Sequence, residues 1–434
     1  MGFTEGQLGH LAKHDDIDAL TATHTSQIAS GDVTDPASAA SISLSATLAA
    51  STVGPVPASA AVQGLYSRTF PTPSPATGGI TVLAKDPSIA GRLWAQREGT
   101  IYGSLGYTDD NGDTWTLKVA TPAGGTAGTP SMKFSGAYVF ITQGPGSTAR
   151  DSSLWRSPAP DANGDGLVFT KIFDLAAPPA GITTGDASIF KGGCLDVNGA
   201  NVYLLEYSLG TGASTGGPQL YHSPDYGATW YSRKQWANCK HGHDVRVINA
   251  VPWVTLGDPG PGLTDLGLWS ATNASATTWI QRNLFGEEIG GNTCYGIGFI
   301  PITISGIPMI AIEADGNRNF GPLFYPSQDL TGLKSIVPAF TMPITNLGSM
   351  RCLTLTSDGN LMWLHTGEGG SIGPMDSVCI SRGPDFSVPI VLETMPSTTS
   401  NAFAGGRGTR EPIENGDYIW IGANRIRKEK FLGQ

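Results

Sequence analysis

The fold is decided by two stretches, Thr108-Asp-Asp-Asn-Gly-Asp-Thr-Trp115 and Ser223-Pro-Asp-Tyr-Gly-Ala-Thr-Trp230. Both follow the pattern Ser/Thr-x-Asp-x-Gly-x-Thr-Trp. In such a turn the aspartate accepts backbone N–H groups, the glycine adopts a positive φ, and the tryptophan packs between sheets. We therefore expect two copies of one structural turn that takes no part in chemistry. Its residues are Asp110, Gly112, Trp115, Asp225, Gly227 and Trp230.

A second signal recurs along the chain at intervals of 45 to 63 residues. A short turn, nearly always ending in glycine, separates two runs that are rich in β-branched and apolar residues. The seven turns are Ala90-Gly91, Ser135-Gly136, Asn198-Gly199, Asn249-Ala250, Ser305-Gly306, Asp358-Gly359 and Asn415-Gly416. Such turns typically connect β-hairpins. Seven hairpins at this period predict an all-β, seven-bladed β-propeller, with a six-bladed one as the alternative.

The composition agrees with this fold and excludes several others. Of 434 residues, 58 are Gly and 30 are Pro, a frequency of helix breakers that a helical bundle would not tolerate. Hydrophobic residues make up 40% and charged residues 14%, the opposite of a disordered chain. The net charge of −10 argues against nucleic-acid binding. Five widely spaced cysteines without a CxxC motif argue against a disulfide scaffold or a zinc site.

One uncharged stretch, residues 289–312, is long enough to raise the question of a membrane span. Pro301, Pro308 and the turn at Ser305-Gly306 favour a hairpin instead. The N-terminus also has no basic region followed by an apolar core, so no secretory signal is expected. We therefore expect no membrane insertion.

The chain divides into a segment of residues 1–61 and a propeller of residues 62–434. Residues 4–22 are predicted to form a short helix, because Leu8, Leu11, Ile17 and Leu20 form a sparse apolar stripe. An extended Ala/Ser/Thr-rich linker follows. Two interpretations of this segment stay open, a disordered tail and an oligomerising or docking segment. Residues 64–70 are predicted to supply the strand that closes the ring.

Candidate ligand-binding residues are expected on the face of the propeller opposite the two eight-residue turns at residues 108–115 and 223–230. Long glycine-rich loops should connect the strands there, and polar groups end several second strands at similar offsets. A ring of such groups suits a hydroxyl-rich ligand, and solvated loop tips are the alternative. The candidates are Glu206, His241, His243, Asp244, Arg246, Asp258, Glu313, Asp315, Arg318, Arg351, Glu368 and Arg410.

Two motifs suggest metal binding, and neither is complete. His241-Gly-His243 places two potential ligands on one side of a strand, but no third ligand is evident, which favours a hydrogen-bonded pair. Asp161, Asn163 and Asp165 fit the start of a calcium loop, yet position twelve is Ile172 instead of Glu. This stretch lies where the second repeat should have the turn found at residues 108–115 and 223–230. An elaborated form of that turn is therefore favoured over a calcium site. No cofactor is expected, and calcium is the one candidate.

The eight-position motif resembles the Asp-box of sialidase-like propellers, and weaker relatives span residues 270–279, 327–330 and 381–386. Hydrolases of that family grip a carboxylate with three arginines and also use a Tyr/Glu pair and an Asp. Arg246, Arg351 and Arg410 all lie in expected first strands at offsets of the same parity. The early Arg-Ile-Pro motif of the family is absent. We therefore assign no catalytic residue, and a glycoside hydrolase is the alternative function.

The N-terminal motif Phe3-Thr-Glu-Gly-Gln-Leu-Gly-His-Leu-Ala-Lys-His14, with its linker and propeller, resembles minor tail proteins of phages infecting actinobacteria. The resemblance implies a virion tail protein assembled in the host bacterial cytoplasm. Residues 1–61 would dock on other tail proteins, in a homotrimer, and the propeller would bind a host envelope glycan or another receptor. A purely structural virion scaffold is a further alternative.

Overall fold

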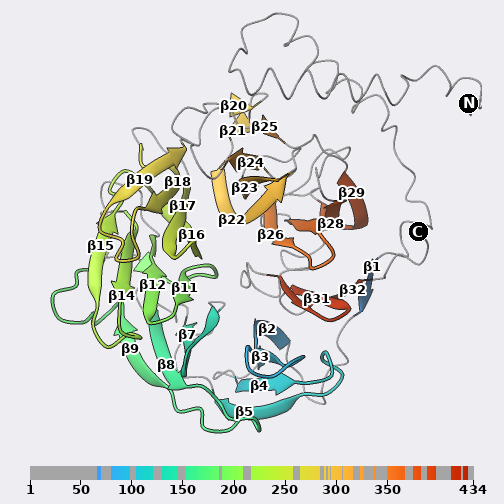
Figure 1. The fold of residues 1–434 in the computed structure, drawn as a ribbon, viewed down its shortest axis with the longest axis horizontal. Helices are drawn as coiled ribbons and strands as arrows, with labels where there is room; N and C mark the ends of the chain where they lie inside the picture. The colour runs from blue at the N-terminus through green and yellow to red at the C-terminus, as the bar shows by residue number, and fades with distance from the viewer. Residues whose placement is uncertain are drawn as a thin grey trace, which may run out of the picture. The chain divides into compact units, whose positions relative to one another are not determined.

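The computed structural model describes the chain in nineteen ranges, all of which lie in the second of its two units, Pro57–Gln434 (Figure 1). The ranges are 66–69, 80–97, 104–120, 130–143, 152–184, 188–208, 217–257, 264–283, 288–289, 292–293, 295–304, 306–315, 323–326, 337–338, 349–366, 375–382, 389–396, 412–421 and 424–428. These ranges contain strands and turns and no helix. The predicted N-terminal helix and linker lie outside them.

The described strands form seven four-stranded antiparallel sheets, which follow one another in chain order (Figure 1). Sheet 1 contains β2 (Ile80–Lys85), β3 (Leu93–Arg97), β4 (Ser104–Thr108) and β5 (Thr116–Ala120). Sheet 2 contains β6 (Met132–Ser135), β7 (Tyr138–Gln143), β8 (Ser153–Pro158) and β9 (Thr170–Asp174). Sheet 3 contains β11 (Leu195–Asn198), β12 (Asn201–Leu205), β14 (Gln219–Ser223) and β15 (Tyr231–Gln235). Sheet 4 contains β16 (His241–Ile248), β17 (Val251–Gly257), β18 (Gly267–Ala271) and β19 (Trp279–Asn283).

The remaining sheets repeat this arrangement. Sheet 5 contains β22 (Tyr295–Ile304), β23 (Ile307–Asp315), β24 (Leu323–Pro326) and β25 (Val337–Pro338). Sheet 6 contains β26 (Ser349–Leu355), β27 (Asn360–Thr366), β28 (Met375–Arg382) and β29 (Pro389–Pro396). Sheet 7 contains β30 (Ile413–Asn415), β31 (Tyr418–Ile421), β32 (Asn424–Lys428) and β1 (Tyr66–Thr69). Two small pairs are β10 (Ser188–Ile189) with β13 (Tyr207–Ser208), and β20 (Glu288–Ile289) with β21 (Asn292–Thr293). The predicted all-β propeller is confirmed.

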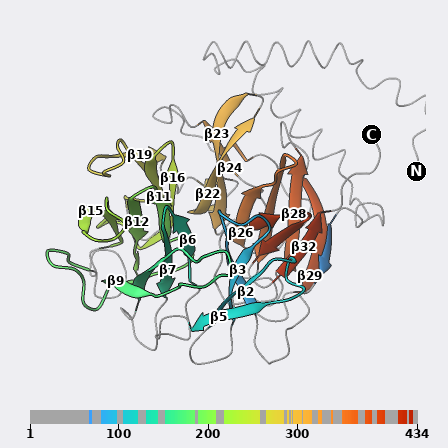
Figure 2. The same cartoon turned by 60° about the horizontal axis from the view of Figure 1, so that its bottom comes forward.

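The sheets close into a ring through the two ends of the described chain. Strand β1 pairs with β32, from Tyr66 opposite Lys428 to Thr69 opposite Arg425, so the predicted closing strand is confirmed. The first strands of sheets 1 to 6 pack side by side in order, and β30 of sheet 7 packs on β2 of sheet 1. Figure 2 shows β26, β28 and β29 of sheet 6 beside β32 of sheet 7. The backbone N–H and hydroxyl of Ser357 there donate to the two carboxylate oxygens of Glu414 at 2.7 and 2.6 Å.

Apolar side chains on both faces of the sheets explain why the sheets stack. In β12 the consecutive residues Val202, Tyr203, Leu204 and Leu205 are all at most 1% exposed. A strand with one solvated face would alternate apolar and polar residues, so a continuous buried run indicates a sheet packed between two neighbours. The hairpin predicted within residues 289–312 is also confirmed, because Ile304 pairs with Ile307 around Gly306 at φ 82°. None of the described ranges includes a helix with the length and hydrophobicity needed to cross a bilayer.

The two box turns have the geometry that the sequence predicts. Asp110 Oδ1 accepts the Thr114 N–H at 2.9 Å, and Asp225 Oδ1 accepts the Thr229 N–H at 2.8 Å. Gly112 and Gly227 have φ of 91° and 88°. Burial raises the pKa of Asp110 and Asp225, but hydrogen bonds outweigh it and the net shift lowers both pKa values. Each aspartate therefore stabilises its turn in the charged form.

The hydrogen bond that closes the box turn recurs in sheets 2 and 4, although the positive-φ residues Gly164 and Ala276 lie there three positions after the Asp or Asn instead of one and two. Asp161 Oδ1 accepts the Asp165 N–H at 2.9 Å, and Asn273 Oδ1 accepts the Thr277 N–H at 3.3 Å. Both bonds span four residues, as in the two full boxes. This hydrogen bond agrees with the interpretation of residues 161–166 as an elaborated box turn and of residues 270–279 as a relative of the box. The other two weak relatives, residues 327–330 and 381–386, lie wholly or mostly outside the described ranges.

In all four turns the residue after the box Asp or Asn receives a hydrogen bond from the preceding sheet. The donor is an arginine or tyrosine side chain, and the acceptor is a backbone carbonyl. The pairs are Arg425 to Asn111, Arg92 to Ala162 at 3.0 Å, Arg156 to Tyr226 at 2.7 Å and Tyr203 to Ala274 at 2.5 Å. The box turns therefore join each sheet to its predecessor as well as closing a local loop.

Candidate functional site

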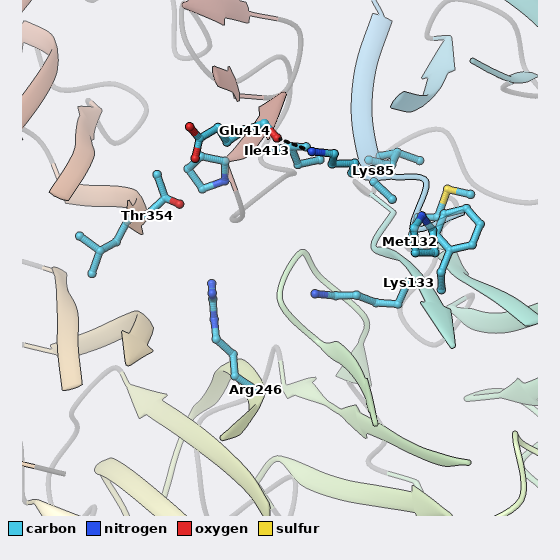
Figure 3. Close-up of a pocket in the computed structure, with 13 residues that line it drawn as sticks. Lys85, Met132, Lys133, Arg246, Thr354, Ile413 and Glu414 are labelled. Carbon is cyan, nitrogen blue, oxygen red and sulfur yellow. Dashed lines mark hydrogen bonds between the residues drawn. The ribbon is translucent and has the colours of Figure 1, made fainter. Parts of the chain in front are cut away.

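A cavity of about 410 Å³ lies where the first strands of five sheets meet (Figure 3). Sheets 1, 2, 4, 6 and 7 all contribute to it through the strands β2, β6, β16, β26 and β30 or the residues beside them. The lining residues are Leu83, Ala84, Lys85, Pro87, Met132, Lys133, Phe134, Arg246, Leu353, Thr354, Pro412, Ile413 and Glu414. The first strands of the sheets are the ones that pack on each other around the ring. The cavity is therefore central to the propeller.

The cavity lies toward the hairpin end of these strands. Phe134, Arg246 and Glu414 precede the turns at Gly136, Asn249 and Gly416 by only two or three residues. The box turns connect third to fourth strands, so they lie at this same end. The sequence predicted the ligand at the opposite end, in loops whose residues are outside the described ranges, namely 144–151, 209–216, 258–263, 316–322 and 367–374. That placement stays a prediction.

Three basic side chains from different sheets line the cavity. Arg246 and Lys133 both point into the open space in Figure 3, from β16 and β6. Their side chains are 14% and 21% exposed. Lys85 extends from β2 and donates to the backbone carbonyl of Glu414 at 3.5 Å. One basic side chain from each of sheets 1, 2 and 4 thus lines the same cavity.

Two carboxylates outside the cavity lining, one buried and one partly exposed, hold two of these cations. Asp244 is 1% exposed, and its Oδ2 accepts Arg246 Nε at 2.7 Å. Asp196 on β11 accepts the Val247 N–H at 2.7 Å with Oδ2 and lies 3.5 Å from Lys133 Nζ with Oδ1. A guanidinium group that is held through its Nε keeps its orientation, because the group is planar and rigid. These contacts position the Arg246 and Lys133 side chains.

Glu414 is the single carboxylate among the residues that line the cavity. Both of its oxygens accept hydrogen bonds from Ser357 at the junction of sheets 6 and 7. The rest of the lining combines apolar side chains, such as Met132 and Phe134, with the hydroxyl of Thr354. The cavity can therefore provide apolar contact together with positively charged hydrogen-bond donors.

Besides Asp244, four of the predicted ligand-binding residues are deeply buried against protein. Glu206 and Glu313 are 0% exposed, and His241 and His243 are both 4% exposed. The Tyr221 hydroxyl donates to Glu206 Oε1 at 2.5 Å, and the Leu353 N–H donates to Glu313 Oε1 at 2.6 Å. These contacts link neighbouring strands or sheets.

The histidine pair packs on an aromatic ring. The imidazole of His241 stacks on Tyr207 at a centroid distance of 4.1 Å, and its Nδ1 contacts the carbonyl oxygen of Ser208. His243 lies 6.0 Å from the same ring, and Lys191 Nζ lies 3.3 Å from its centroid. No group of three or more His, Cys, Asp or Glu residues arranged for a metal occurs within the described ranges. This geometry agrees with a hydrogen-bonded histidine pair.

Of the remaining candidates, Asp244 and Arg246 are brought together at the cavity. The backbones of Asp315 and Arg351 lie in β23 and β26, and their side chains are outside what the structure describes. Asp258, Arg318, Glu368 and Arg410 lie outside the described ranges. Of the three arginines Arg246, Arg351 and Arg410, the structure therefore describes the side chain of Arg246 alone.

Lys85 and Lys133 are cavity residues that the sequence did not indicate. Consecutive residues line the cavity in β2 and β6, so strand alternation does not select them. The available signal was their position in a first strand just before a hairpin turn.

The calcium-loop residues make contacts within the protein. The Asp161 carboxylate accepts the N–H groups of Asn163 and Asp165 at 2.8 and 2.9 Å. Lys118 Nζ lies 2.9 Å from Asp165 Oδ1. Lys118 thus pairs with one of the carboxylates that a calcium loop would direct at its calcium ion.

No protein-family model matches the chain, and no curated protein sequence matches it. Solved structures do resemble it. An oligogalacturonate lyase from Vibrio parahaemolyticus has a TM-score of 0.50 at 10% identity, over 84% of this chain and 96% of that one. YCF48 from Cyanidioschyzon merolae has a TM-score of 0.48 at 12% identity, over 84% and 99%. An α-L-arabinofuranosidase from Fusarium graminearum has a TM-score of 0.39 at 13% identity, over 70% and 92%. At these identities the likeness concerns the fold alone, and the likeness to the lyase, at a TM-score of 0.50, agrees with a β-propeller.

Proposed function

We propose that the seven sheets are the blades of one seven-bladed propeller whose central cavity binds a carbohydrate. The observation that carries this proposal is the cavity lined by Lys85, Lys133 and Arg246 beside apolar side chains. Sugar rings combine apolar faces with hydroxyl groups, and binding sites for small ligands combine apolar walls with a few placed polar groups. The fold is shared with an oligogalacturonate lyase, so one protein of this architecture is named for a carbohydrate substrate.

Binding without catalysis is the activity we favour. Most glycoside hydrolases need two carboxyl groups on either side of the scissile bond. The cavity lining contains Glu414 as its one carboxylate, and Ser357 occupies both of its oxygens. A glycan hydrolase on the same propeller is the alternative.

The biological setting that we propose is a phage tail. The motif of residues 3–14 and the linker support this setting through their resemblance to minor tail proteins. In this proposal residues 1–61 dock on other tail proteins in a homotrimer, and the propeller binds a glycan of the host envelope. A purely structural virion protein is the competing proposal.

The test is a binding screen of the full-length chain against host-envelope polysaccharides and defined oligosaccharides. Each sample is also analysed for shortened products. Saturable binding without new products would support a receptor-binding head, and product formation would support the hydrolase. The absence of binding to any polysaccharide would contradict a carbohydrate-binding function.

A further inference from the structure

We propose that the central cavity recognises an acidic group of the glycan, and that Arg246 and Lys133 bind this group. The inference deepens the proposed function and rests on it. This acidic group is an oxyanion, either the carboxylate of a uronic acid or the phosphate of a sugar-phosphate polymer.

The cavity lining is richer in basic side chains than the chain as a whole. The whole chain carries 26 basic and 36 acidic residues, for a net charge of −10. Three basic side chains and one acidic side chain line the cavity, while Asp244 and Asp196, which pair with Arg246 and Lys133, lie outside the lining. Charges that line a concave site focus the electrostatic field there, so a ligand in the cavity meets the cations before their paired carboxylates.

The orientation of Arg246 is fixed by a buried partner. Asp244 is buried and its Oδ2 accepts Arg246 Nε at 2.7 Å, while Arg246 lines the cavity. A guanidinium group binds carboxylate or phosphate oxygens through charge-assisted hydrogen bonds. Because Asp244 fixes the side chain in advance, binding costs little conformational entropy.

Lys133 and Arg246 reach the same cavity from different sheets. The two side chains approach the open space from different sheets in Figure 3, and Asp196 lies close to both strands. A single oxyanion between them would contact two cations. Lys85, at the far side beside Glu414, would add a weaker long-range attraction.

The apolar part of the lining suits the remainder of a sugar. Leu83, Met132, Phe134 and Leu353 all line the same cavity. They provide apolar contact for the carbon face of a ring while its acidic group contacts the basic residues.

The experiment measures binding of the full-length chain to three probes by isothermal titration calorimetry. The probes are trigalacturonate, a glycerol-phosphate oligomer and neutral trigalactose. We expect at least one acidic probe to bind at least tenfold more tightly than trigalactose, and we expect its affinity to fall as salt rises. The preferred acidic probe identifies the source of the oxyanion. Equal affinity for acidic and neutral probes would overturn the inference.

Variants then locate the acidic group. Lys133→Gln and Arg246→Lys should each weaken binding of the acidic probe about ten- to a hundredfold, because the first removes a positive charge and the second removes the planar guanidinium group. Lys85→Gln should weaken it only a few fold, since its side chain is more exposed. Lys171→Gln is the matched control, because Lys171 pairs with Asp174 away from the cavity and should leave affinity unchanged.

Folding is controlled by melting each variant. Arg246→Lys keeps a cation beside the buried Asp244, and Lys133→Gln keeps a hydrogen-bond donor near Asp196. If folded Lys133→Gln and Arg246→Lys both bind the acidic probe like the parent, the inference is wrong. If neutral glycans bind and acidic ones do not, the inference fails while the carbohydrate-binding function stands. If no glycan binds but inorganic phosphate binds in an Arg246-dependent way, the carbohydrate-binding function fails while the anion site stands.

Discussion

Asn415 and Asn111 are 304 residues apart in the sequence, and Nδ2 of Asn415 donates to Oδ1 of Asn111 at 2.7 Å. The same amide donates to the carbonyl oxygen of Gly91 at 2.7 Å. Arg425 adds a contact to the Asn111 carbonyl and an ion pair with Asp113 at 2.9 Å. The box turn of sheet 1 is thus bonded to the hairpin turn of sheet 7. This contact closes the ring in addition to the strand pairing of β1 with β32.

Replacing Asn415 should therefore loosen ring closure. Asn415 is 2% exposed, so Asn415→Ala leaves the Gly91 carbonyl and the Asn111 amide without their buried donor. The expected loss is about 1–3 kcal/mol in the free energy of unfolding, measured in urea. Asp417→Ala changes an exposed residue of the same turn and should have little effect. Equal stability of the two variants would show that the contact contributes nothing.

The box aspartates should affect stability and leave ligand binding unchanged. Asp225→Ala removes the acceptor of the Thr229 N–H and hydroxyl, which should cost about 1–3 kcal/mol of unfolding free energy. Asp225 does not line the cavity, so the folded variant should bind ligand like the parent. Thermal melting and calorimetric binding check the two parts. Lost binding at an unchanged melting temperature would place the ligand at the box turn.

His222 should make stability fall as the pH drops from 7 to 5. Burial, together with the positive charge of Arg233, lowers the pKa of His222 to about 4. Its ordinary pKa is 6.5. Below pH 6.5 the unfolded chain takes up a proton that the folded chain excludes, so the unfolded state gains stability. This effect should amount to about 2 kcal/mol between pH 7 and pH 5.

The matched variant for this pH effect is His222→Gln. Its amide can still donate to Asn201 Oδ1, which contacts His222 Nε2 at 2.8 Å. The variant should lose less stability than the parent between pH 7 and pH 5 in urea titrations. An identical loss in both proteins would assign the pH dependence to other groups.

Truncation should separate the closing strand from the residues before it. Strand β1 occupies the edge of sheet 7 beside β32. Removal of residues 1–61 should leave a monomeric propeller that melts cooperatively. Removal of residues 1–70 exposes the hydrogen-bonding edge of β32 and should cause aggregation. Light scattering distinguishes these outcomes, and a fragment of residues 62–434 that is unfolded or trimeric would contradict this division.

The sequence predicted the fold well because local turn chemistry repeats. Aspartate and glycine at fixed positions specify the box turns, and the full boxes at Asp110 and Asp225 adopt the predicted hydrogen bonds. Even the incomplete turn at Asp161 follows the pattern, because its bond to Asp165 depends on one carboxylate and four residues of spacing.

The candidate site was much less predictable, because it depends on the packing of five sheets. The sequence indicated Arg246 but placed it at the other end of the propeller, among loops outside the described residues. Lys133 contributes to the cavity because the edge of its strand faces the other first strands, so neighbours of both parities line it. Glu206 was expected to face a ligand, yet the adjacent sheet strand supplies its partner, Tyr221. The alternation of residues along one strand predicts neither how other sheets pack around a residue nor which side chain becomes its hydrogen-bond partner.

The most direct test of carbohydrate binding in the central cavity is hydrogen–deuterium exchange of the full-length chain with and without the preferred acidic glycan. We predict that the bound glycan slows amide exchange in the first strands that line the cavity, above all in β6 and β16. Slower exchange confined to the loops 144–151, 209–216 and 258–263 would instead place the ligand at the opposite end. That result, or the absence of any change under saturating glycan, would contradict binding in the central cavity.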